Sequence, residues 1–302
     1  MQNAGIAALG LNWRYLAFDV DPANLREALA GAKRMGFVGV NLTVPHKLLA
    51  VDMVDALDDS AKLLGAVNTI VFETRDKAGT WIPVGQSSQN PIKEIRSHGY
   101  NTDGEAFIRG IREDLALDLR GKGVVLLGAG GAGRVAAFKL AEAGVADLFL
   151  INRTERKAQE LAVRIAEEHP GVSVKTSAQL GEEVRKWNPN VNVVHTYPAS
   201  RFAALLVNST SLGLNESDSL PLDQDQFPIY EADCVYDMIY RPAETPLLKA
   251  AKKAGCRTAN GLGMLLYQGA KALEIWTGKP APVEIMRRAL EQNVYGPQQP
   301  ES

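Results

Sequence analysis

A glycine-rich turn that follows an apolar run constrains this chain more than any other feature. The segment VVLLGAGGAGRVAAF sets Gly128, Gly130 and Gly133 in the pattern G-x-G-x-x-G, between a strand-like stretch and a helix-forming run. In that context the first glycine permits a tight turn, the second admits a pyrophosphate, and the third lets helix and strand pack. The alternative is a tight turn without a ligand, but the N–H groups of a helix start favour phosphate. We therefore predict a dinucleotide-binding turn built from Gly128, Ala129, Gly130, Gly131 and Ala132.

The next strand, in LFLINRTERK, predicts which dinucleotide is bound. NAD-preferring domains usually carry an acidic residue about 20 residues after the glycines, where it binds the ribose 2′-hydroxyl. This chain has Asn152 there, followed by Arg153. A carboxylate would repel a 2′-phosphate, whereas a guanidinium can clamp it. Basic residues in the first turn of a helix oppose the helix dipole, which favours a bound anion over a solvated helix start. We expect NADP, contacted by Asn152, Arg153, Thr154, Glu155, Arg156 and Lys157.

Strand-like and helix-like segments alternate along the chain, which predicts an α/β fold with parallel sheets. The expected strands are Trp13–Phe18, Phe37–Leu42, Val67–Glu73, Gly123–Leu127, Asp147–Ile151, Leu205–Asn208, Cys234–Asp237 and Arg257–Ala259. The expected helices are Asn3–Leu9, Asn24–Met35, Pro45–Ala56, Thr102–Leu115, Gly131–Ala143, Glu155–Glu168, Leu262–Thr277 and Pro282–Asn293. Residues 74–100 interrupt the alternation and are interpreted as a hairpin extension with an exposed loop.

Charge and cysteine content exclude several classes of protein. The formal net charge of -2 offers no general attraction to nucleic acid or to an anionic membrane. No apolar run reaches the ~18 residues of a spanning helix. Cys234 and Cys256 lie in apolar, strand-like surroundings, which indicates buried thiols rather than a disulfide or a metal site. We expect a cytoplasmic protein that binds no metal, nucleic acid or membrane.

Two polar segments carry candidate chemistry. In NLTVPHK, Lys47 follows the end of a strand and precedes a helix, at the sheet edge where α/β proteins bind ligands. In NTDGEAF, Thr102 and Glu105 fit a capping box, and Asp103 would lie in a first helical turn, where the dipole favours its charge. Taken alone, Lys47 fits a solvated lysine and Asp103 a helix-terminal residue.

The order of the motifs is more specific than any one of them. The chain contains NLTVPHK, AVNTI, NTDG, GAGGAG, NRT, NSTSLG, DMIYRP and GLGMLLYQGAKALEIWTG. Together these resemble the motifs of the shikimate dehydrogenase family over nearly the whole chain. The resemblance implies a parallel α/β substrate domain at residues 1–102, onto which the C-terminal helices at 262–302 pack. It further implies a Rossmann dinucleotide-binding domain at residues 103–261.

The resemblance also implies an activity, the NADP-dependent reduction of 3-dehydroshikimate to shikimate in aromatic amino acid biosynthesis. Lys47 matches the family's catalytic lysine and Asp103 its partner. The matching substrate-binding positions are Thr43, Asn68, Asp103, Tyr240 and Gln268. Met238 and Gly261 match positions beside the nicotinamide. Asn, Thr and Gln suit a polyhydroxylated substrate, because a site built to bind hydroxyls rejects analogues that lack them.

Several alternatives stay open. Within the family, a quinate/shikimate dehydrogenase could use NAD or NADP; outside enzymology, the chain could be a non-catalytic dinucleotide-binding relative. The oligomeric state is open between a monomer and a homodimer. Residues 71–100 exceed the family's usual hairpin and fit an inert loop or a segment that flanks the site or an oligomer surface.

The first residues depart from the family pattern. Family members open with a strand and a loop of the form Ser-x-Ser-Pro that binds the substrate carboxylate, whereas MQNAGIAALGLNWRYLAFDV aligns from the following helix onward. We therefore expect the substrate domain to be incomplete at its N-terminus and the reading frame to continue upstream of Met1. We further expect the chain as written to fold poorly or bind shikimate weakly.

Overall fold

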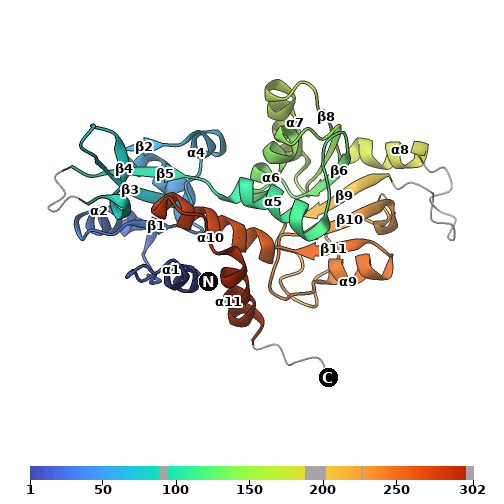
Figure 1. Ribbon diagram of the computed structural model, residues 1–302. Coiled ribbons are helices and arrows are strands. Elements are labelled where there is room, and N and C mark those ends of the chain that lie inside the picture. Colours follow the sequence, from blue (N-terminus) through green and yellow to red (C-terminus); the bar gives the residue numbers. More distant parts are fainter. Residues whose placement is uncertain (89–93, 188–201, 226, 297–302) are drawn as a thin grey trace. The chain divides into compact units, whose positions relative to one another are not determined.

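The computed structural model describes residues 1–88, 94–187, 202–225 and 227–296, with the elements labelled in Figure 1. The chain divides into two compact units, Met1–Ala106 with Leu265–Ser302, and Phe107–Met264. The divisions fall inside helices α5 (Asp103–Leu115) and α10 (Leu262–Thr277), a few residues beyond the predicted boundaries at 102 and 262. The α/β class predicted from the sequence is confirmed in both units. No helix within the described ranges is both long and apolar enough to cross a membrane.

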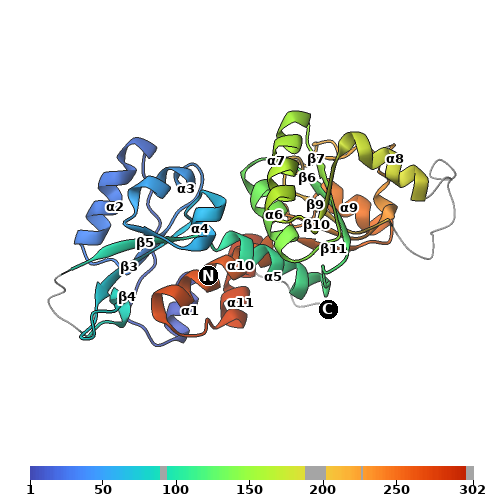
Figure 2. The same ribbon diagram turned by 90° about the horizontal axis from the view of Figure 1, so that it is seen from above.

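The second unit contains a parallel sheet with the strand order β11-β10-β9-β6-β7-β8. Each neighbouring pair is parallel. The strands are β6 (Gly123–Leu127), β7 (Asp147–Ile151), β8 (Ser173–Thr176), β9 (Ala203–Asn208), β10 (Ala232–Asp237) and β11 (Arg257–Asn260). The helices besides α5 are α6 (Gly131–Glu142), α7 (Glu155–Glu168), α8 (Ser177–Trp187) and α9 (Pro246–Lys253), with a short 3-10 helix, η4 (Ile229–Glu231). In Figure 2, α6 and α7 cover one face of this sheet and α8 and α9 the other.

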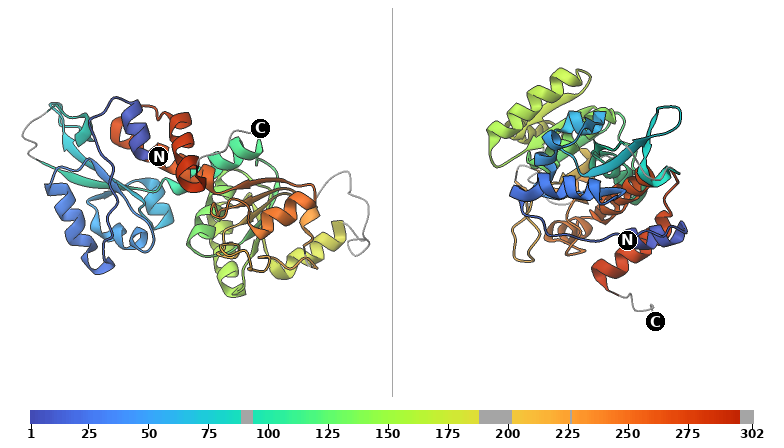
Figure 3. Two further views of the ribbon diagram at one scale, coloured as in Figure 1. Left: turned by 90° about the horizontal axis from the view of Figure 1, so that it is seen from below. Right: turned by 90° about the vertical axis from the view of Figure 1, so that its left-hand side faces the viewer.

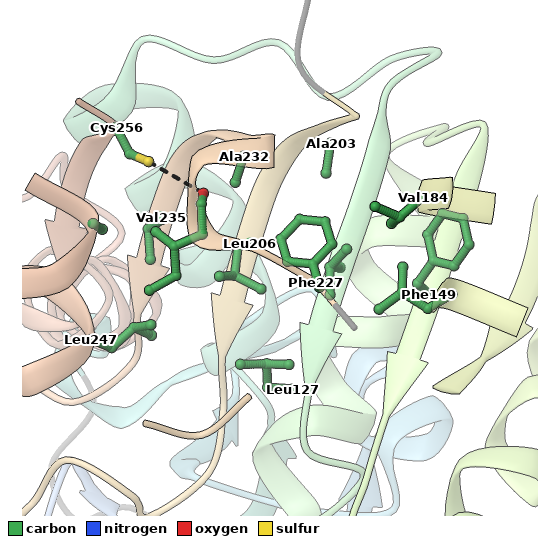
Figure 4. Packing of buried hydrophobic residues seen from close by; sticks show 14 of the residues in the cluster. Leu127, Phe149, Val184, Ala203, Leu206, Phe227, Ala232, Val235, Leu247 and Cys256 are labelled. Carbon is green, nitrogen blue, oxygen red and sulfur yellow. Dashed lines mark hydrogen bonds between the residues drawn. The ribbon is translucent and has the colours of Figure 1, made fainter. Parts of the chain in front are cut away.

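Burial of both faces explains the continuous apolar runs in the inner strands β6, β7 and β9. Figure 4 shows the face beneath α8 and α9, where Leu127, Phe149 and Val235 belong to one cluster of buried side chains. Cys256 belongs to this cluster, and its thiol donates a hydrogen bond to the Ile229 carbonyl at 3.5 Å. Both cysteines are buried, so the prediction of buried thiols is confirmed.

The first unit contains a mixed sheet, so the expectation of a parallel substrate domain is wrong for this sheet. Its order is β1-β3-β5-β2, and β4 also pairs with β3. Strand β3 is antiparallel to β1, β4 and β5, whereas β2 and β5 are parallel. The strands are β1 (Gly39–Asn41), β2 (Ala56–Leu57), β3 (Thr69–Arg75), β4 (Trp81–Pro83) and β5 (Arg96–Tyr100). Strands β3 and β4 follow each other without the helical crossover that parallel neighbours need, so the chain reverses direction.

Helices cover both faces of this mixed sheet. They are α1 (Gln2–Ala8), α2 (Leu25–Arg34), α3 (His46–Leu49), α4 (Asp59–Leu64), α10 and α11 (Val283–Tyr295), and the short 3-10 helices are η1 (Pro22–Asn24), η2 (Ala50–Met53) and η3 (Val84–Gln86). Figure 2 shows α2, α3 and α4 on one face, and Figure 3 shows α1 beside α11 on the other. Leu25 and Leu29 of α2 pack on Ile70 and Phe72 of β3. On the opposite face, the Trp276 indole of α10 donates to the Ile70 carbonyl at 3.0 Å.

Two predicted elements of the first unit are corrected. The helix expected at Pro45–Ala56 is broken into α3, η2 and the start of β2. The strand expected at Trp13–Phe18 is irregular chain. The side chain of Asn3 forms the two backbone hydrogen bonds that a neighbouring strand would form with Tyr15. Tyr15 N–H donates to Asn3 Oδ1 at 2.8 Å, and Asn3 Nδ2 donates to the Tyr15 carbonyl at 2.9 Å. A side-chain amide therefore satisfies the backbone that a strand would otherwise pair.

Candidate active site

The first unit brings a lysine and a carboxylate together. Lys47 lies on α3, after the turn that follows β1, and Asp103 is the first residue of α5. Lys47 Nζ lies 2.8 Å from Asp103 Oδ2, and the side chains are 26% and 14% exposed. The positive end of the α5 dipole stabilises the Asp103 carboxylate. The pair is sheltered but not fully buried, which suits an ammonium that must meet a small molecule.

Asn68 lies directly behind this pair. It is 1% exposed, and its Nδ2 donates to Asp103 Oδ1 at 2.7 Å and to Thr102 Oγ1 at 3.0 Å. Thr102 N–H donates to Asn68 Oδ1 at 2.9 Å. The family resemblance places Asn68 at the substrate hydroxyls, and that role stays a prediction. In the structure its Nδ2 contacts two protein groups, and the bond to Oδ1 orients the Asp103 carboxylate.

The expected capping box at the start of α5 is wrong. The Thr102 hydroxyl lies 3.1 Å from the backbone carbonyl of Gln268 on α10, and Glu105 forms an ion pair with Lys271 at 3.2 Å. Long-range partners in α10 therefore replace the local reciprocal bonds that the spacing suggested. Thr102 consequently connects Asn68, Gln268 and the start of α5.

Two predicted substrate-binding residues lie around this group. Gln268 donates from Nε2 to the Leu265 carbonyl at 3.1 Å. Thr43 is exposed in the turn before α3, and its carbonyl accepts the His46 N–H at 2.8 Å. Hydrogen bonds thus join Lys47, Asp103 and Asn68. Within the described part of the chain, Thr43 forms no hydrogen bond to these three residues.

The second unit holds the glycine-rich turn between β6 and α6. Gly128 has a φ of 104°, a left-handed conformation that favours glycine, and its N–H donates to the Ile151 carbonyl at 2.7 Å. A Cβ at Gly133 would lie 2.1 Å from the Gly128 carbonyl oxygen. Gly130 and Gly131 are exposed, and a Cβ at either position would meet open space out to 4 Å. The first turn of α6 therefore presents N–H groups to an open surface that fits a phosphate.

Asn152 fixes the shape of this turn. Its Oδ1 accepts the Ala129 N–H at 3.0 Å, and its Nδ2 donates to the Thr154 carbonyl at 2.8 Å. It thereby ties the glycine turn to the start of α7. The Glu155 carboxylate accepts a hydrogen bond from the Ser177 hydroxyl, which directs it toward α8.

The basic side chains of this segment remain at the surface. Arg153 and Lys157 are exposed, and Arg156 pairs with Glu160 on its own helix at 3.2 Å. Of the two exposed side chains, the planar guanidinium of Arg153 can bind a phosphate through two hydrogen bonds and suits a 2′-phosphate better than the ammonium of Lys157.

Met238 and Gly261 lie against each other in the second unit. A Cβ at Gly261 would lie 2.0 Å from the Met238 carbonyl oxygen, and Tyr240 nearby in sequence is 37% exposed. The buried Asp237 supports this loop, accepting from the Thr245 hydroxyl at 2.6 Å and from the Ile239 N–H at 3.1 Å. Burial raises the pKa of Asp237, and these hydrogen bonds oppose the shift. Asp237 begins the motif DMIYRP, but its supporting role cannot be read from the sequence, because Thr245 lies eight residues further on.

Substituting Gly133 with alanine tests the packing of the turn. We expect the free energy of unfolding to fall by ~1–3 kcal/mol, because the new methyl group would overlap the Gly128 carbonyl. Gly131→Ala is the control for stability, since open space surrounds that position, and it should change the free energy by less than ~0.5 kcal/mol. Denaturant titrations of both variants measure the difference. Equal stability would contradict the close approach of α6 to β6.

A parallel sheet with a glycine-rich phosphate turn, together with a sheltered Lys47–Asp103 pair, defines a pyridine-nucleotide-dependent dehydrogenase. Family models describe the same regions: the shikimate dehydrogenase substrate binding domain matches residues 1–70, shikimate / quinate 5-dehydrogenase residues 111–188, and the shikimate 5′-dehydrogenase C-terminal domain residues 261–291. Shikimate dehydrogenase (NADP(+)) of Methanopyrus kandleri is 40% identical over 296 residues, which cover 97% of this chain and 90% of that protein. The chain belongs to the shikimate dehydrogenase family.

Solved structures agree with this assignment. A crystal structure of shikimate dehydrogenase in complex with NADP+ has a TM-score of 0.74 and 33% identity, covering 97% of this chain and 89% of that chain. The ligand-free 5-ketofructose reductase of Gluconobacter sp. strain CHM43 also has a TM-score of 0.74, with 32% identity and coverages of 97% and 92%. The same fold therefore occurs in proteins named for different substrates, so the substrate is argued from the site.

Proposed function

We propose that the chain is an NADP-dependent shikimate dehydrogenase that reduces 3-dehydroshikimate to shikimate. The observation that carries the proposal is the Lys47 ammonium held 2.8 Å from Asp103, with Asn68 bonded to the other carboxylate oxygen. An oriented ammonium can donate a proton to the oxygen of a ketone as it is reduced. The family relationship adds the substrate class, because relatives of about 40% identity are named for shikimate and NADP(+).

Proton transfer is the part of the reaction that these residues perform. NADPH, when bound, supplies the hydride. Lys47 donates the proton to the developing alkoxide of 3-dehydroshikimate, and in the reverse direction it accepts the proton from the shikimate hydroxyl. Asp103 holds the ammonium in place and stabilises its charge, so the proton is delivered from a fixed position.

The cofactor assignment follows from the open first turn of α6 and the basic start of α7. Gly131, Ala132 and Gly133 contribute backbone N–H groups of the kind that bind a pyrophosphate. Asn152 stands where NAD-preferring domains carry a carboxylate, and Arg153 beside it is exposed and cationic. This combination favours the additional phosphate of NADP over the free ribose hydroxyl of NAD.

Steady-state kinetics with a panel of substrates and both cofactors test the proposal. We expect kcat/KM for shikimate with NADP+ to exceed the values for quinate, and for NAD+, by at least ~10-fold. A higher value for quinate would instead support the quinate/shikimate dehydrogenase alternative. Reduction of 5-ketofructose without turnover of shikimate would assign the site to a different polyol. Cofactor binding without any turnover would support a non-catalytic relative.

A further inference from the structure

A chain of four hydrogen bonds, partly sheltered from solvent, connects Asp103 to Tyr15. Asn68 donates to Asp103 Oδ1 at 2.7 Å and accepts from the Thr69 hydroxyl at 3.0 Å. Thr69 Oγ1 accepts from Asn41 Nδ2 at 3.0 Å, and Asn41 Oδ1 accepts from the Tyr15 hydroxyl at 3.1 Å. From Tyr15 through Asn41, Thr69 and Asn68, each side chain donates a hydrogen bond to the following one, and the last bond is accepted by the Asp103 carboxylate.

The donors at the start of the chain fix this direction. Asn41 Nδ2 also faces the backbone carbonyl of Asn68, at 3.3 Å, which is an acceptor only. Burial raises the pKa of Tyr15, so its hydroxyl stays protonated and able to donate at ordinary pH. Since Asn41 donates to Thr69, the single proton of the Thr69 hydroxyl is left to point at Asn68 Oδ1.

The orientation of the Asn68 amide decides what Asp103 meets. With Oδ1 facing Thr69, Nδ2 faces the carboxylate; a rotated amide would place an oxygen against it. Thr102 N–H supports the same orientation from the residue before α5, and the Thr69 hydroxyl supports it from β3. Thr69 is 0% exposed and Asn68 is 1% exposed, so water cannot readily replace a lost donor there.

We propose that Thr69 is a positioning residue for the reaction: its hydroxyl, directed by Asn41 and Tyr15, holds Asn68 so that Asp103 stays aligned with Lys47. The inference rests on the proposed function, in which Lys47 transfers the proton. The sequence gives no sign of this role, because the hydrogen bonds from Tyr15 to Asn41 and from Asn41 to Thr69 join segments that are distant along the chain.

The kinetic test compares three variants of β3 threonines. Thr69→Val keeps the shape and removes the hydroxyl; we expect kcat for shikimate to fall about 10-fold, with less than about a threefold change in KM. The solvent deuterium isotope effect on kcat should increase, because a misaligned proton donor makes proton transfer slower. Thr69→Ser should restore kcat to within about twofold. Thr74→Val makes the same change at a second buried threonine of β3 and should behave like the unmodified chain.

A second readout needs no substrate. An amine-acylating reagent followed by peptide mass spectrometry measures the labelling of Lys47 relative to Lys33, which pairs with Asp55 at 2.7 Å and is 28% exposed, close to the 26% of Lys47. Thr69→Val should raise the Lys47-to-Lys33 ratio at least about twofold, because a displaced carboxylate holds the ammonium less firmly. Tyr15→Phe, at a half-buried position, should shift it in the same direction by less.

The outcomes separate this inference from the proposed function. If the unmodified chain does not turn over shikimate, the proposed function fails and the labelling ratio alone decides whether Thr69 positions the pair. If Thr69→Val matches Thr74→Val in both readouts, the positioning role is wrong. If Thr69→Ser is as impaired as Thr69→Val, shape rather than the hydroxyl is responsible, and the inference is overturned as well.

Discussion

Replacing Lys47 with alanine is expected to lower the turnover of shikimate with NADP+ by ~10²–10⁴-fold, the usual contribution of a positioned acid or base. The ammonium lies 2.8 Å from Asp103, so the substitution removes the proton donor and leaves the carboxylate without its cation. NADP affinity should change little, because Lys47 belongs to the first unit and the glycine-rich turn to the second. Steady-state rates and a fluorescence titration with NADPH measure the two quantities.

Lys33 provides a matched control for this prediction. It lies in the same unit and forms an ion pair of similar length with Asp55, so Lys33→Ala removes a comparable charge contact without touching the pair at Asp103. We expect Lys33→Ala to retain nearly full turnover. If Lys47→Ala kept more than about a third of the turnover rate, Lys47 would have no role in proton transfer and would be an ordinary solvated lysine.

The two sheets differ in how far local sequence predicts them. Strands β6 and β7 and helix α7 begin and end at the predicted residues, because continuous apolar runs and a glycine turn are local signals. Strand β8 reads SVKT and contains no buried residue, so its pairing with β7, rather than its composition, makes it a strand. The antiparallel contacts of β3 depend in the same way on chain reversals that periodicity does not encode.

The pairing of Lys47 with Asp103 was predictable from the family resemblance, whereas the contacts around the pair were not. The order of the motifs singled out Lys47 and Asp103, which lie 56 positions apart in the sequence. Their spacing gives no sign that Asn68 would turn its amide toward Asp103, or that Thr102 would bond α10 instead of capping α5. Such roles arise from side chains that meet only once both the sheet and the C-terminal helices have formed.

Arg153→Ala is expected to weaken NADP binding by ~1.5–3 kcal/mol, the loss of a charge-assisted hydrogen bond, which corresponds to roughly 10- to 150-fold in Kd. Arg153 is exposed directly after Asn152, and Asn152 ties the glycine turn to this segment through Ala129 and Thr154. These two hydrogen bonds fix the backbone of Arg153 relative to the glycine-rich turn, where we expect the phosphates to bind. NAD affinity should change little, since NAD has no 2′-phosphate. Titrations of both cofactors measure the selectivity.

The control and the salt dependence make the prediction about Arg153 specific. Arg164 lies later on α7 and pairs with Glu168 at 3.7 Å, so Arg164→Ala removes one positive charge from the same helix without approaching the glycine turn. It should leave the Kd for NADP within about twofold, because exposed charges are screened over ~10 Å at 0.1 M salt. The preference of the unmodified chain for NADP should shrink as salt rises, and that of Arg153→Ala should respond less. Equal losses for NADP and NAD would instead show that Arg153 supports the fold of the turn and does not bind the phosphate.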